Sequence, residues 1–68
     1  MLDVRKALKI LQGRRLTPRQ IRDEFEKVLA MYLQEIPPEF GVWDLFELAR
    51  RERCLTETND GRVLIKVP

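Results

Sequence analysis

A polar, glycine-containing turn follows three stretches with the hydrophobic period of a helix, and this order most constrains the fold. The turn is Thr56-Glu57-Thr58-Asn59-Asp60-Gly61-Arg62. Its Asn-Asp-Gly segment is typical of the loop that joins the strands of a β-hairpin. Helices ahead of a hairpin predict an α+β domain with one shared core. The chain has 68 residues, so residues 1–68 are expected to form a single domain.

The first helix is expected over residues 3–12, with Asp3 as its N-cap. Apolar residues recur there at the spacing of one helical face, namely Val4, Ala7, Leu8 and Leu11. Gly13 follows where a left-handed residue commonly ends a helix.

The second helix, expected over residues 17–36, has the clearest start signal. Thr17-Pro18-Arg19-Gln20 predicts a capping box, in which the side chains of Thr17 and Gln20 each bond the other residue's backbone N–H. Pro37-Pro38 is expected to end this helix, because the residue before a proline avoids the helical region. Its predicted buried face comprises Ile21, Phe25, Val28, Leu29, Tyr32 and Ile36.

The third helix is expected over residues 40–53, with an apolar stripe of Val42, Leu45, Phe46 and Ala49. Glu47 and Arg51 are spaced to form an i, i+4 ion pair. Trp43 lies at the edge of the stripe. A tryptophan in that place more often closes the edge of the core, but it is also suited to stack on an unpaired base or to anchor a protein partner.

The hairpin is expected over residues 54–67, and two registers are compatible with the sequence. A two-residue Asp60-Gly61 loop pairs Thr56 with Ile65, whereas a three-residue loop with left-handed Gly61 pairs Leu55 with Ile65. The second register is favoured because it places the apolar residues of the hairpin on one face, namely Leu55, Val63, Ile65 and Val67. Residues 15–17 are able to add a short third strand.

Together these elements predict a small α+β winged helix, in which three helices are followed by a β-hairpin wing. The chain has no histidine and no serine, which removes the commonest general base and hydroxyl nucleophile. Its single cysteine, Cys54, has no histidine to activate it and is expected to be a small buried residue. No metal-ligand set or phosphate-binding glycine loop is evident. We therefore expect no catalytic residues, metal, cofactor or small-molecule substrate.

The charge is strongly segregated along the chain. Residues 1–22 hold seven basic side chains and one acidic one, whereas residues 23–60 hold four basic and ten acidic ones. Arginines crowd the start of the second helix, where the helix dipole already attracts anions. This basic block and the wing together predict phosphate contacts from Arg5, Lys9, Arg14, Arg15, Arg19, Arg22, Arg62 and Lys66. The alternative is that these arginines pair with the acids of residues 23–60, as in an Arg22–Glu26 pair at helical spacing.

The predicted third helix is poorly suited to reading duplex DNA. In a winged helix this element enters the major groove with its N-terminal end leading. Here that end carries Glu39, Asp44 and Glu47, which repel nearby phosphates.

The segment Phe40-Gly41-Val42-Trp43-Asp44-Leu45-Phe46-Glu47-Leu48 resembles the LOTUS (OST-HTH) family of winged helices. In that family an aromatic-glycine pair opens the third helix, leucines follow at helical spacing, and a strand and wing come next. The resemblance implies a non-catalytic module that binds RNA or docks onto an RNA helicase. The chain departs from the family at Val42, where a second aromatic residue is usual, and in its long second helix.

The sequence therefore predicts a non-enzymatic module that binds DNA or RNA through its basic block and wing. The alternative is a protein-interaction or homodimerisation domain that uses its acidic 23–60 surface. One cysteine, no apolar run after the first residues and no stretch of about 20 apolar residues favour an intracellular, cytoplasmic protein without a signal peptide or membrane segment.

Overall fold

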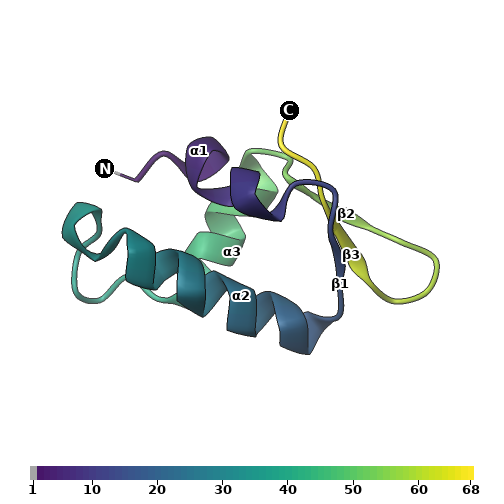
Figure 1. Cartoon of the computed structure of the whole chain (residues 1–68), viewed down its shortest axis with the longest axis horizontal. Helices are drawn as coiled ribbons and strands as arrows, with labels where there is room; N and C mark the ends of the chain where they lie inside the picture. The colour runs from purple at the N-terminus through teal and green to yellow at the C-terminus, as the bar shows by residue number, and fades with distance from the viewer. Residues whose placement is uncertain (1) are drawn as a thin grey trace.

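The computed structural model describes residues 2–68, which form an α+β domain (Figure 1). Within this range, three α-helices and a three-stranded antiparallel sheet surround one core. The elements follow one another as α1 (Val4–Leu8), the 3-10 helix η1 (Lys9–Leu11), β1 (Arg15–Leu16), α2 (Pro18–Met31), the 3-10 helix η2 (Leu33–Glu35), α3 (Val42–Arg51), β2 (Leu55–Glu57) and β3 (Val63–Ile65). The sheet lies at one end of the helices, and its hairpin projects away from them.

The first helix begins as predicted but is shorter. The Asp3 carboxylate accepts a hydrogen bond from the Lys6 N–H at 3.2 Å, so Asp3 is the N-cap. The α-helix ends at Leu8 and tightens into η1, because the chain must turn toward the sheet. Gly13 has a φ of +81° and its N–H donates to the Ile65 carbonyl at 2.7 Å, which joins this turn to β3.

The second helix begins with the predicted capping box. The Gln20 N–H donates to Thr17 Oγ1 at 3.2 Å, and the Thr17 N–H donates to Gln20 Oε1 at 2.9 Å. The prediction that this helix reaches Ile36 is wrong, since α2 ends at Met31 and η2 follows. The Tyr32 N–H bonds the Leu29 carbonyl at 3.1 Å, an i to i−3 bond that tightens the last turn.

The third helix runs from Val42 to Arg51, two residues shorter at each end than predicted. Its start is fixed by Asp44, whose carboxylate accepts a hydrogen bond from the Gly41 N–H at 2.8 Å. At the other end, Arg53 has a left-handed φ of 59°, which ends the helical backbone and turns the chain toward β2.

The hairpin has the favoured register. Leu55 pairs with Ile65 and Glu57 with Val63. Gly61 has a φ of +79°, and its N–H donates to the Thr58 carbonyl at 3.2 Å, as in a three-residue loop with a left-handed glycine. The expected third strand is present as β1, which pairs with β3, so the sheet order is β1-β3-β2.

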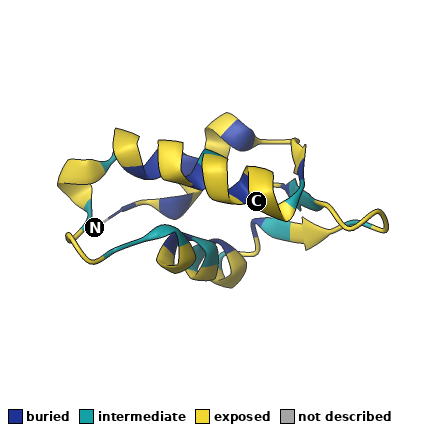
Figure 2. Ribbon diagram, turned by 90° about the horizontal axis from the view of Figure 1, so that it is seen from below, coloured by how far each residue is buried: buried dark blue, intermediate teal, exposed yellow. Residues whose placement is uncertain are grey.

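The core is apolar and connects all the main elements. The largest fully buried side chains are Phe25, Leu8, Leu11, Leu16, Leu45 and Ile65. Figure 2 shows that the helices turn their buried surfaces toward one another, while the hairpin tip is exposed. The exposed large hydrophobic residues are Ile10, Met31, Leu33 and Trp43. Of these, Trp43 lines a groove on the surface.

Candidate functional site

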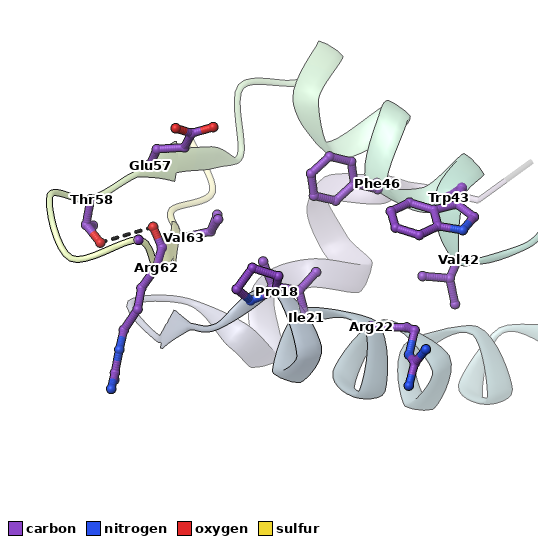
Figure 3. A pocket seen from close by; sticks show the side chains of 11 residues that line it. Pro18, Ile21, Arg22, Val42, Trp43, Phe46, Glu57, Thr58, Arg62 and Val63 are labelled. Carbon is purple, nitrogen blue, oxygen red and sulfur yellow. Dashed lines mark hydrogen bonds between the residues drawn. The ribbon is translucent and has the colours of Figure 1, made fainter.

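A groove of about 340 Å³ opens between the start of α2, the start of α3 and the β2–β3 hairpin (Figure 3). Its apolar lining comes from Pro18, Ile21, Val42, Trp43, Phe46 and Val63. Arg22, Glu57, Thr58, Gly61 and Arg62 complete the wall. The capping box positions the α2 side of this groove, and the hairpin register positions Val63 and Glu57 on the other side.

Trp43 has 72% of its surface exposed, so the prediction that it closes the edge of the core is wrong. Its ring packs edge-on against Phe46, with centroids 6.2 Å apart and planes at 75°. Phe46 in turn packs against the buried ring of Phe25 at 6.4 Å. One side of the indole is therefore supported by a chain of aromatic contacts to the core, while much of its surface remains available to a ligand.

Two arginines extend from the same side of the groove, past Pro18 and Ile21, in Figure 3. Arg22 Nε lies 4.0 Å from Asp23 Oδ1, and Arg62 Nε lies 3.7 Å from Asp60 Oδ2. Both arginine side chains are at least half exposed. Exposed ion pairs at these distances contribute little energy, so a bound anion is able to replace the acidic partners.

The tip of the hairpin is organised around Asp60. The Asp60 carboxylate accepts hydrogen bonds from the Thr58 hydroxyl, from the Arg62 N–H at 3.2 Å and from Arg15 Nη2 at 3.5 Å. The pKa of Asp60 is lowered, mainly by the hydrogen bond from Thr58; desolvation opposes this shift, and the Arg62 N–H and the charge of Arg15 add to it. This network fixes the backbone from which Arg62 projects.

The remaining residues of the predicted basic set lie outside the lining of the groove. Arg5 Nε bonds Glu52 Oε1 at 2.8 Å, and Arg14 Nη1 lies 3.4 Å from Glu24 Oε1. Arg15 joins the hairpin tip, and Arg19 lies one turn before Arg22 on α2. Lys9 is on η1, and Lys66 follows β3. The structure thus brings Arg22, Arg62 and Trp43 together and distributes the other basic residues.

Two predicted ion pairs on the helices form with different partners. Within residues 2–68, Arg22 contacts Asp23 instead of Glu26. Glu47 contacts Arg50 at 3.4 Å, in place of the predicted contact with Arg51. In both cases the side chains are exposed and more than one oppositely charged side chain lies nearby, so the partner is not determined by helical spacing alone.

The apolar floor of the groove was not predicted as a site, because Ile21 and Val63 have the spacing of core residues. Cys54 is fully buried, and this burial raises the pKa of its thiol. In the part of the chain that the structure describes, no group of three or more acidic or sulfur side chains is placed to hold a metal ion.

Comparison of this chain with known protein families, curated proteins and solved structures found no match. Across residues 2–68, no helix has the length and apolar character needed to cross a membrane.

Proposed function

We propose that this chain is a winged-helix module that binds single-stranded nucleic acid without catalysing a reaction. The order α1, β1, α2, α3, β2, β3 and the sheet order β1-β3-β2 support the winged-helix assignment, with the hairpin as the wing. The lone buried cysteine is consistent with a reducing, intracellular setting.

The observation that carries the proposal is the exposed ring of Trp43 beside an apolar groove, with Arg22 and Arg62 extending on one side of it (Figure 3). A base face is flat and apolar, so it is able to stack on the indole and cover the groove. Stacking of this kind contributes about 1–3 kcal/mol per base and tolerates any sequence. Arg22 and Arg62 extend on a common side, where they are able to follow the phosphates of the same strand.

A single strand is favoured over a duplex because of the acids on α3. Asp44 and Glu47 are exposed on the helix that a duplex-reading winged helix inserts into the major groove. Close approach of two phosphate backbones to these carboxylates is repulsive. A flexible single strand is able to contact the arginine rim and Trp43 while it avoids the outer face of α3.

The test is a fluorescence-anisotropy titration of a labelled 12-nucleotide single strand and of the corresponding duplex at two salt concentrations. Trp43→Ala is expected to weaken single-strand binding by about 1–3 kcal/mol. The double variant Arg22→Gln/Arg62→Gln is expected to lower the log-affinity against log-salt slope by about 0.7 for each lost phosphate contact. Glu47→Gln removes an exposed acid of α3 without touching the Asp44 cap, and it is expected to leave binding unchanged or to tighten it.

Lys9→Gln and Lys66→Gln are the matched controls, because each removes one positive charge outside the groove. Both controls are expected to bind almost as well as the parent. If they weaken binding as much as the Arg22 and Arg62 changes do, phosphate contacts are spread over the basic block and the groove is not the site.

A second candidate is protein docking, which the apolar lining favours. An apolar side chain of a partner would enter between Ile21, Phe46 and Val63, with Trp43 as the exposed anchor. Selection of a random 12-residue peptide library on the parent domain, with the Trp43→Ala variant as counter-selection, tests this reading. An enriched peptide together with no single-strand binding at low salt would replace the nucleic-acid proposal.

A further inference from the structure

The strand β2 has an open edge. It is the outer strand of the sheet, beside β3 on one side only. Hydrogen bonds at the two ends of the β2–β3 ladder run from the Thr58 N–H to the Arg62 carbonyl and from the Lys66 N–H to the Cys54 carbonyl, both at 2.8 Å. Because antiparallel strands alternate their bonding, the backbone groups of Leu55 and Glu57 point away from β3. Such an edge is a template for another strand.

The side chains along this edge border a second hollow of about 300 Å³. Leu55 and Glu57 lie on the same face of the strand, and Phe46, Arg50 and Val63 complete the lining. The Cys54 N–H, just before β2, donates to the Ala49 carbonyl at 2.9 Å. Arg50 follows Ala49 in α3, so Arg50 lies at the end of the hollow near the start of β2. The hollow therefore has the positively charged Arg50 at one end. At the other end it has the Phe46 ring beside the negatively charged Glu57.

We propose that a second copy of this chain pairs with this edge, β2 against β2, across a twofold axis at Thr56. In this register Leu55 lies opposite the partner's Glu57, and Glu57 opposite the partner's Leu55. Both of these pairs exchange backbone hydrogen bonds, because the groups of Leu55 and Glu57 are the outward-pointing ones. The result is one continuous six-stranded sheet.

The side chains of β2 are complementary to the hollow that they would enter. The partner's Glu57 lies beside Leu55, at the end of the hollow that holds Arg50. The partner's Leu55 lies beside Glu57, near Phe46. The twofold axis makes the Arg50–Glu57 ion pair and the Leu55–Phe46 contact form twice, once in each direction between the two copies.

Other symmetric registers are less favourable. An axis at Glu57 would place the two Glu57 carboxylates opposite each other, which is repulsive. An axis at Leu55 would require Arg53 to join the strand, but its φ of 59° lies outside the extended region. An edge of three residues buries little area, so a weak, concentration-dependent dimer is expected.

Sedimentation velocity at low salt, from micromolar to millimolar protein, tests the proposal. The parent mass is expected to rise from one chain toward two with concentration. Arg50→Glu and Glu57→Arg each make both ion pairs repulsive and are expected to weaken self-association at least about tenfold. Circular dichroism of both variants checks that the fold is retained, and Arg51→Glu, outside the hollow, is the matched charge control.

The decisive sample is an equal mixture of the Arg50→Glu and Glu57→Arg variants. Each alone is expected to stay a monomer, but a mixed pair places opposite charges at both positions and is expected to dimerise. A parent that remains one chain at every concentration overturns the proposal, as do variants that self-associate like the parent or a mixture that forms no dimer. The interface does not depend on nucleic-acid binding, so either proposal is able to fail alone.

Discussion

Replacing Thr17 by alanine tests the element that positions α2 and one wall of the groove. The change removes the oxygen that accepts the Gln20 N–H at 3.2 Å, while the Gln20 side chain keeps its bond to the backbone N–H of residue 17. Loss of such an N-cap costs about 1 kcal/mol. For a chain of 68 residues, the entropy of unfolding converts this loss into a decrease in Tm of about 7 °C.

Thermal unfolding followed by circular dichroism at 222 nm measures this effect. Thr17→Ser keeps the accepting oxygen and is expected to melt close to the parent. Thr56→Ala, on an exposed strand position, controls for the loss of a threonine elsewhere. A Thr17→Ala variant with an unchanged Tm would mean that the capping box does not stabilise α2, and the account of how the groove wall is fixed would be wrong.

Three further outcomes follow from the hairpin and from Cys54. Gly61→Val is expected to destabilise the domain by about 1–3 kcal/mol in chemical denaturation, because a β-branched residue resists a φ of +79°, and a parent-like midpoint would contradict the turn. The lowered pKa of Asp60 adds stability that is present above its usual value of 3.8 and is lost as the pH falls through the folded pKa. The Tm difference between the parent and Asp60→Asn should therefore shrink from pH 6 to pH 3, and a constant difference would exclude this contribution. Cys54 should resist iodoacetamide in the native state and react on unfolding, so rapid native labelling would contradict its burial.

Local chemistry in the sequence predicted the boundaries that it controls directly. The capping box at Thr17 and the left-handed Gly61 each depend on a few adjacent residues, and the structure contains both. The length of α2 depends on more than its apolar spacing. Tyr32 and Ile36 continue the helical period, yet the chain tightens into η2 and Ile36 is extended before Pro37.

The candidate site was less accessible to sequence reasoning because it depends on contacts between distant segments. Arg5 pairs with Glu52 and Arg14 pairs with Glu24, so these two members of the basic block lie away from the arginines of the groove. Trp43 lies at the edge of an apolar stripe, so a small rotation of α3 decides whether its ring is buried or exposed. The sequence supplied the residue types, but the packing of α3 against α2 and the hairpin determines which of them meet.

The proposed function is tested most directly by the fluorescence of Trp43, the only tryptophan in the chain. A base that stacks on the indole quenches its emission, so titration with unlabelled single-stranded oligonucleotides reports contact at the groove itself. We expect saturable quenching by single strands that weakens with salt and is reduced in the Arg22→Gln/Arg62→Gln variant, with little quenching by the matched duplex. Unchanged Trp43 emission under conditions where anisotropy shows that the strand is bound would place the ligand elsewhere and contradict the proposed site.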